Sequence, residues 1–359
     1  MRQSLKFLGL ALTLAASASA CAVPTNPTTN ANGVAPAAAP ATPTAGQVPV
    51  FSGGPWIDNG QIPTRAEGAT SAQIVGATQS PHVSDGTGNF RTFCFYSHMA
   101  FDDPIVAPGQ PGASHLHTFF GNTTTDAFST ADSIANSGAS TCRGGILNRS
   151  AYWVPSMIDT STGAPLQPSY MIAYYKTGYG GVDPWEVVAM PAGLRMIAGR
   201  PATATEADPN PAYLRHLSWR CTYDQRGNGT DTTPGMQQCS PGSWVTMGVG
   251  FPQCWDGRNL DSPDHRSHMA YPDGSGCPAS HPVALPAIGI NVSWQVPSSG
   301  NGSWRLSSDT YSGGEGGYSG HADWWNGWDP ATMQTWIDNC LRQGLDCDVE
   351  VLGNSTQLG

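Results

Sequence analysis

The sequence predicts a mainly β fold: a single β-sandwich, jelly-roll-like or barrel-like domain with long Gly/Pro loops, a C-terminal α-helix and disulfides. Three observations predict it. Turn-forming residues abound, with 43 glycines and 30 prolines among 359 residues. Short β-like runs recur between turn signals, and only 12 % of the residues are charged, about half the roughly 25 % usual in a soluble domain. With 16 basic and 26 acidic residues, the chain lacks the surplus cations that bind phosphates, so no nucleic-acid partner is expected.

Seven runs between turn signals have the residue types and alternation of β-strands. They span residues 169–175, 185–191, 194–199, 216–223, 244–252, 287–296 and 303–309. The alternation is clearest in the sixth run, where Ile288, Ile290, Val292 and Trp294 share one face. We expect that face to point into the core.

One helix is predicted near the C-terminus. Asp329 can cap it, and Pro330 suits its first position. A single apolar stripe runs along it, formed by Met333, Trp336, Ile337, Cys340 and Leu341. Gly344 is a natural stop for this helix.

The cysteines predict disulfides. Setting Cys21 aside leaves eight of the nine cysteines, an even number that would form four bonds in an exported chain. Among the 105 possible connectivities, we favour pairing in sequence order: Cys94–Cys142, Cys221–Cys239, Cys254–Cys277 and Cys340–Cys347.

The N-terminal segment has the features of a targeting signal. Basic residues precede an apolar run over residues 7–16, and small residues follow it up to Ala20, so residues 1–20 are expected to be a signal peptide. These small residues before Cys21 resemble a bacterial lipobox, which predicts a protein anchored to the membrane through a lipid on Cys21 alone. The alternative is a protein secreted after cleavage at Ala20. Residues 21–50 are uncharged and rich in Ala, Pro and Thr, so they predict a disordered tether, and residues 51–359 predict one extracytoplasmic domain.

Three segments combine histidine, aspartate and aromatic residues with glycine or proline turns: residues 97–122, 251–272 and 317–329. They hold six of the nine histidines. In extended backbone His115 and His117 project to one face, and His321 and Asp323 have the same spacing. These imidazoles, together with His268, are candidate ligands of a divalent metal, Zn, Mn or Fe.

Ordinary structural roles are the alternative for the same residues. Histidines in turn-rich segments often bond backbone carbonyls, and aspartates beside glycine or proline often fix turns. About one close histidine pair is expected by chance at this histidine content, so the spacing alone is a weak indication of metal. The glycine-rich run 313–320 lacks the strand–helix context and lysine of a phosphate loop, so no nucleotide is expected.

Six long stretches stand out as motifs: DDPIVAPGQPGASHLHTFFGN, TCRGGILNRSAYWVPSM, MPAGLRMIAG, FPQCWDGRNLDSPDHRSHMAYP, CPASHPVALP and GYSGHADWWNGWD. In these stretches the chain resembles the DUF1996 domain family of bacteria and fungi. They run from about Phe93 to about Cys340, nearly the whole domain. The residues that the motifs carry over by position are His98, Asp103, His115, His117, Asn122, Arg143, Asn148, Tyr152, Trp153, Trp255, Asp256, Arg258, Asp261, Asp264, His265, His268, His321, Asp323 and Trp328.

The family resemblance implies a setting and no established reaction. Fungal members are often joined to WSC modules, which are associated with wall polysaccharide, so a glycan-rich environment is implied. The family usually has an aromatic residue after the PIV sequence, where this chain has Ala107, a difference expected to alter a pocket wall.

Three functional hypotheses follow. The first is a cell-envelope protein with a His/Asp-lined cleft that hydrolyses or binds polysaccharide; the second is a non-catalytic glycan-binding or structural envelope lipoprotein; the third is a metal-dependent hydrolase or oxidase. The candidate catalytic residues are His115, His117, Asp103, Asp256, Asp264, His268, His321 and Asp323, since glycosidic cleavage commonly needs two carboxyl groups. The candidate metal ligands are His115, His117, His268 and His321. The candidate substrate-binding residues are Asn122, Tyr152, Trp153, Trp255, Arg258 and Trp328.

Overall fold

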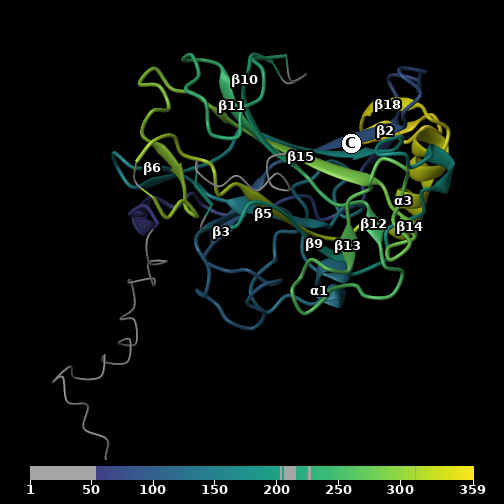
Figure 1. Ribbon diagram of the computed structural model, residues 1–359, viewed down its shortest axis with the longest axis horizontal. Helices are drawn as coiled ribbons and strands as arrows, with labels where there is room; N and C mark the ends of the chain where they lie inside the picture. Colours follow the sequence, from purple (N-terminus) through teal and green to yellow (C-terminus); the bar gives the residue numbers. More distant parts are fainter. Residues whose placement is uncertain (1–53, 203, 206–215, 225–227, 312) are drawn as a thin grey trace, which may run out of the picture. The chain divides into compact units, whose positions relative to one another are not determined.

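Two β-sheets form the frame of the structure, a computed structural model that describes residues 54–202, 204–205, 216–224, 228–311 and 313–359 (Figure 1). The larger sheet has the strand order β10 (Leu217–Thr222), β11 (Trp244–Gly250), β15 (Ala287–Gln295), β8 (Tyr170–Lys176), β2 (Asn89–Cys94) and β18 (Asp346–Val349). The smaller has the order β3 (Tyr96–Ala100), β4 (His117–Gly121), β5 (Ala151–Pro155), β17 (His321–Trp325) and β9 (Arg195–Gly199). Neighbouring strands in both sheets are antiparallel, except for the parallel pair β18–β2.

Three small sheets and short helices complete the fold. The sheets are β1 (Ile74–Gly76) with β19 (Thr356–Leu358); β13 (Met269–Ala270), β12 (Cys254–Trp255) and β14 (Val283–Ala284); and β16 (Trp304–Leu306), β6 (Met157–Asp159) and β7 (Ala164–Leu166). The helices are η1 (Asn59–Gln61), α1 (Ala131–Asn136), η2 (Pro184–Glu186), α3 (Pro330–Trp336) and η3 (Ile337–Leu341). No helix among the described residues has the length and apolar character needed to cross a membrane.

The main hydrophobic core lies between the two large sheets. It joins Ile290 of β15 and Tyr175 of β8 to Tyr152 of β5 and Trp324 of β17 in one buried cluster, and Figure 1 shows β15 above β5 and β9. Alternation along each strand sends every second side chain into this layer. The fold is therefore mainly β and sandwich-like, as predicted, and the sheets of the described residues form no closed barrel.

The smaller sheet is also covered on its other face. Phe119, Trp153 and Trp325 point away from the main core and pack with Ile105 and with Ile134 of α1 in a second buried cluster. The loop before β4, which contains Ile105, and helix α1 after it thus cover this face. Polar side chains that share the face are consequently held away from bulk water.

Several sequence predictions are confirmed. All four disulfides join the cysteines in sequence order, Cys94–Cys142, Cys221–Cys239, Cys254–Cys277 and Cys340–Cys347. Such bonds are typical of proteins outside the cytoplasm. Ile288, Ile290, Val292 and Trp294 are all buried, as their alternation predicts. The expected signal peptide and tether, over residues 1–50, lie outside the described residues.

Two predicted elements need correction. The strand predicted at residues 185–191 is wrong: Pro184 opens the short helix η2, whose first turn is closed by Asp183 N–H donating to Glu186 Oε2 at 3.2 Å. A proline and an acidic capping pair there favour a turn over a strand ladder. The C-terminal helix is present and is capped by Asp329, but it widens from α into a π-helical turn, η3, before it ends at Leu341.

Candidate metal centre

Three histidines converge on the covered face of the smaller sheet. His117 begins β4, His321 begins β17, and His115 lies two residues before β4. One ligand atom from each lies within 4.8 Å of the others, and all three side chains are buried. The ring centroids are 4.2 Å apart for His115 and His117, 5.0 Å for His115 and His321, and 5.8 Å for His117 and His321.

Strand register brings these residues together. His117 on β4 is paired with Pro155 of β5, and Asp323 on β17 is paired with Trp153 of the same strand. Continuing that register by two residues places His321 level with Pro155, across β5 from His117. A proline between them has no long side chain to separate the two imidazoles, so they can meet above it.

Backbone carbonyls fix the orientation of two of the rings. His117 Nδ1 lies 2.9 Å from the Asp102 carbonyl oxygen, and His321 Nδ1 lies 2.8 Å from that of Ser319. A carbonyl oxygen can only accept, so each Nδ1 carries the proton and donates it, which makes each Nε2 a lone-pair donor to a metal. His117 Nε2 is buried and has no hydrogen-bond partner among the described residues.

Burial keeps the three imidazoles neutral. It lowers the pKa of His117 to about 4 and that of His321 to about 3, and it lowers the pKa of His115 well below its ordinary value. For His115 and His321, proximity adds to the lowering of the pKa, because a proton on a neighbouring ring would repel a proton on theirs. Neutral imidazole is the form that ligates metals, so the three rings have the protonation state that metal binding requires.

Two buried carboxyl groups lie in the same region. Asp103 Oδ1 accepts the backbone N–H groups of Ile105 and Val106, each at 3.0 Å. Neither carboxylate oxygen of Asp323 has a hydrogen-bond partner among the described residues. Burial raises the pKa of Asp103, and burial and the neighbouring Asp103 raise that of Asp323 well above its ordinary value. A buried, unsatisfied carboxyl group is rare and requires a specific cause, such as a nearby cation.

The three segments singled out in the sequence do come together here. The middle segment, residues 251–272, packs against β9 and β17. Arg195 of β9 lies 3.1 Å from Asp261 of that segment, and its guanidinium carbon lies 4.1 Å from the centre of the Trp325 ring of β17. Arg266 donates to the Ile197 carbonyl oxygen at 3.3 Å. Its charge acts on both His321 and Asp323, so Arg266 is the cation of this site that sequence reasoning did not select.

His268 has a different environment from the three clustered histidines. Its Nδ1 lies 2.9 Å from Ser262 Oγ, and its Nε2 lies 2.7 Å from the Arg195 carbonyl oxygen. Both ring nitrogens are thus occupied by protein groups, and His268 is not part of the cluster within 4.8 Å. Its contacts hold the middle segment against β9.

Two of the candidate carboxylates organise turns. Asp256 accepts the backbone N–H groups of Arg258 and Asn259, at 2.8 and 2.9 Å. Asp264 accepts those of Arg266 and Ser267 at 3.2 and 2.9 Å, and these bonds with the serine hydroxyls lower its pKa far below its ordinary value. The geometry of both is that of local turn formation.

Most of the candidate substrate-binding residues occupy the interior. Tyr152, Trp153, Trp328 and Asn122 are all buried, and Asn122 donates to two carbonyl oxygens and accepts a backbone N–H. Trp255 is half-buried, and Arg258 is exposed on the turn that Asp256 forms.

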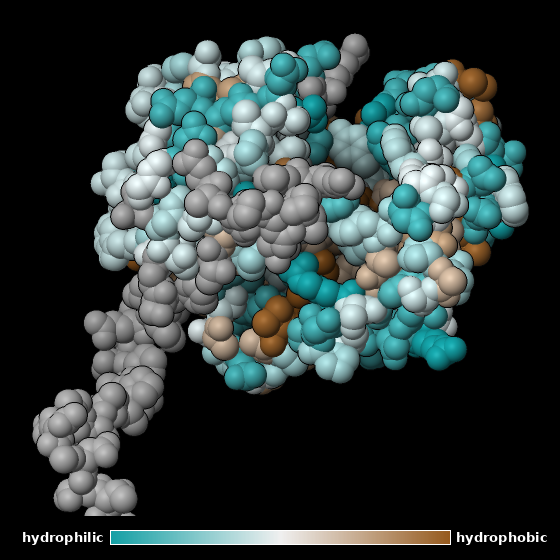
Figure 2. Space-filling model, viewed as in Figure 1, coloured by the Kyte–Doolittle hydropathy of each residue, from teal (hydrophilic) through white to brown (hydrophobic). Residues whose placement is uncertain are grey.

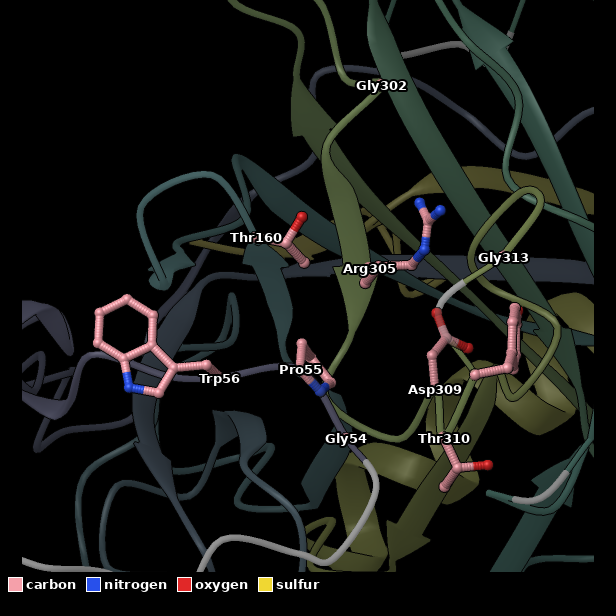
Figure 3. A pocket seen from close by; sticks show the side chains of 10 residues that line it. Gly54, Pro55, Trp56, Thr160, Gly302, Arg305, Asp309, Thr310 and Gly313 are labelled. Atoms are coloured by element: carbon pink, nitrogen blue, oxygen red, sulfur yellow. The ribbon is translucent and has the colours of Figure 1, made fainter.

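A pocket of about 690 Å³ lies elsewhere, beside β16 (Figure 3). Its charged residues are engaged within the protein. Arg305 donates to the carbonyl oxygens of Trp304 and Gly314 at 2.8 and 2.6 Å, and Asp309 accepts from backbone N–H groups through both oxygens. The indole of Trp56 points away from the other labelled side chains in Figure 3. This pocket therefore offers less chemistry than the histidine cluster.

Comparison with known families places the chain. A family model described as a domain of unknown function, DUF1996, matches residues 103–328. The chain belongs to the DUF1996 family. The match covers more than half of the chain and includes all three clustered histidines and both buried carboxyl residues. No curated protein and no solved structure matches the chain.

Proposed function

We propose that this DUF1996 protein is an extracytoplasmic metal-dependent hydrolase, with a divalent ion held by His115, His117 and His321, and that it acts on polysaccharide of the cell envelope. The observation that carries the proposal is the arrangement of three buried imidazoles within 4.8 Å of one another. Two of them are oriented by backbone carbonyls, which leaves Nε2 of each ring with its lone pair. Support of this kind around the ligands is usual at metal sites.

Zinc is the ion that this donor set favours. Three imidazoles with a free fourth position are a common catalytic zinc site, and a water bound there has a pKa of about 7. Manganese prefers oxygen ligands, and non-haem iron commonly has two histidines and one carboxylate. His115 and His321 are each 8 % exposed, whereas His117 is fully buried, so the proposed centre lies just beneath the surface.

Asp103 and Arg266 are the groups that we assign to substrate positioning. Both charges act on His321, and the two residues come from the other two motif segments. A carboxyl group and a guanidinium there could bond sugar hydroxyls. Replacing Asp103 by Asn should lower turnover while the zinc content stays the same; equal loss of zinc would instead make Asp103 a structural support of the metal centre.

Metal analysis is the decisive test. Protein purified without chelator should contain about one zinc per chain, and a variant with His115→Ala, His117→Asn and His321→Ala should contain almost none. Reducing-end release should then be measured on a panel of wall polysaccharides, with the triple variant and a chelated sample as controls. Wild-type protein without metal would refute the metal centre. Zinc without release from any polymer would refute the hydrolase and favour a non-catalytic envelope protein.

We further propose that residues 1–20 are removed, that Cys21 carries a lipid, and that residues 21–50 tether one domain formed by residues 51–359. The support is the lipobox-like sequence before Cys21 and the even number of cysteines that remain, all of them paired. Intact mass of the mature protein tests this. A chain that begins at Cys21 without a diacylglyceryl group would refute the anchor and support secretion.

A further inference from the structure

The outer face of the larger sheet is a second place where chemistry gathers, on the opposite side of the sandwich core from the histidines. A groove of about 470 Å³ lies on it. Its charged, aromatic and amide residues are Arg91, Tyr174, Lys176, Tyr179, Arg220 and Asn291. Figure 2 shows a hollow in the surface between the region of β10 and β11 and the region of β18. In Figure 1, which has the same view, strands of the larger sheet lie below this hollow.

Glycine forms part of the floor of this groove. In the strand register, Arg91 is level with Tyr174, Tyr174 with Gly289, and Gly289 with Gly250. A Cβ on Gly289 would meet nothing closer than 3.9 Å, and one on Gly250 nothing closer than 3.8 Å. Close packing therefore does not require glycine at either position. The missing side chain of Gly289 leaves an open channel in the floor of the groove.

Basic side chains line the channel. Three of the chain's 16 basic residues line it, although the net charge is −10. Arg91 pairs with Asp346 and Asp348. The Lys176 ammonium lies 5.5 and 5.6 Å from the ring centres of Tyr174 and Tyr179. Arg220 has no ion pair with any residue in the described part of the chain, so its charge is available to a ligand.

A smaller hollow continues the surface beyond the groove. It shares Tyr174, Arg220 and Asn291 with the groove and is lined further by Tyr170, Asp224 and the residues Thr222, Thr246 and Ser293, whose buried hydroxyl groups bond to one another. Aromatic faces, hydroxyl groups and an amide are what a polar sugar ring contacts through stacking and hydrogen bonds. Cations along the same line add a requirement for negative charge on the ligand.

We propose that this groove binds a segment of acidic polysaccharide. Sugar carboxylates would pair with Arg220 and Lys176, and a ring would lie against Tyr174. The open channel over Gly289 suits an extended polymer, and charge complementarity selects an acidic one over a neutral one. The site does not depend on the proposed metal centre, because the sandwich core separates the two faces. Its role would be to hold the protein on its matrix.

The test is binding of polygalacturonate by the mature chain, with dextran as the neutral polymer, measured by affinity electrophoresis and by calorimetry. Polygalacturonate should bind, dextran should not, and added salt should weaken the binding. Lys176→Gln with Arg220→Gln should weaken it at least about tenfold, since each charge-assisted hydrogen bond is worth about that factor. Arg342→Gln, at the exposed residue that follows the C-terminal helix, is the control for loss of a positive charge away from the groove.

A second variant tests the channel without changing charge. Gly289→Val would fill it and suits a β-strand, so binding should again fall at least about tenfold. Gln295→Val, on the exposed end of the same strand β15, is its control. Equal binding of dextran, or wild-type binding by both the charge variant and the channel variant, would overturn the proposal. The measurements are repeated with His117→Asn and chelator, where binding should persist even if the metal centre fails.

Discussion

Replacing His117 by Asn separates metal binding from folding at the proposed centre. The amide nitrogen of the introduced asparagine can lie close to the position of His117 Nδ1 and keep the hydrogen bond to the Asp102 carbonyl oxygen, which is 2.9 Å long. The change removes Nε2, the proposed ligand atom. We therefore expect a folded protein that has lost its response to zinc.

The size of that response can be worked out from the size of the domain. About 300 residues unfold together, at roughly 2.1 cal/mol/K of entropy each, so the unfolding entropy is about 0.6 kcal/mol/K. Zinc at a hundred times its Kd adds about 2.7 kcal/mol to the free energy of unfolding. The wild-type Tm should consequently rise by about 4 °C, and that of the His117→Asn variant by less than about 1 °C.

The assay is thermal unfolding of chelator-stripped protein with and without zinc, without reducing agent so that the four disulfides stay intact. His98→Gln is the control, because His98 is also buried but donates to the Thr125 carbonyl oxygen at 2.9 Å and lies outside the cluster. The His98→Gln variant should show the same rise in Tm on adding zinc as the wild type. An equal shift in wild type and in His117→Asn, or no shift in wild type, would refute the reasoning.

Three further predictions concern the surroundings of the centre. Gly199→Ala should lower the free energy of unfolding by about 2 kcal/mol or more in urea, because φ is +91° and the new Cβ would lie 2.7 Å from His321 Cα. Asp102→Ala should weaken zinc binding about 10- to 100-fold by calorimetry, because its carboxylate fixes the loop that orients His117. Acid should destabilise wild type more than His98→Gln: burial lowers the pKa of His98 to about 4, so between pH 6.5 and 4 the unfolded state gains a proton that the folded state does not. The difference should reach about 3 kcal/mol at pH 4 in urea titrations.

Each of these has a control. Gly300→Ala also has positive φ, +80°, but meets nothing within 4 Å, so it measures backbone strain without the clash. Asp126→Ala removes an exposed carboxylate that caps a nearby turn and should leave zinc affinity unchanged. Equal losses in the test and control variants, or parallel pH profiles for wild type and His98→Gln, would contradict the structural explanation.

The sequence predicted the strands well where one face alone is buried. In β15 the alternation is regular because one side meets the core and the other lies at the outer face. The prediction failed at residues 185–191, where β-favouring residues are present but Pro184 and Asp183 close a turn. The two motif strands β4 and β17 were not among the predicted strands, since both of their faces are buried and no alternation remains.

The histidine pair His115 and His117 could be predicted from the i, i+2 spacing, but the third member could not be identified. His321 joins them through strand register across β5, which no local pattern reveals. His268 was an equal candidate in the sequence and differs only because a loop docks its ring against Ser262 and Arg195. The basic groove was missed because Arg91, Lys176 and Arg220 are neighbours only in the finished sheet.

The disulfide connectivity has a consequence for how the protein matures. From Cys94 onward the cysteines pair two by two in sequence order, so that no bond encloses or crosses another along the chain. A chain that enters an oxidising compartment N-terminus first therefore presents the partners of each bond consecutively. We therefore expect that oxidation in order of arrival yields the native set directly, and that a simple thiol oxidase suffices without an isomerase that reshuffles wrong pairs.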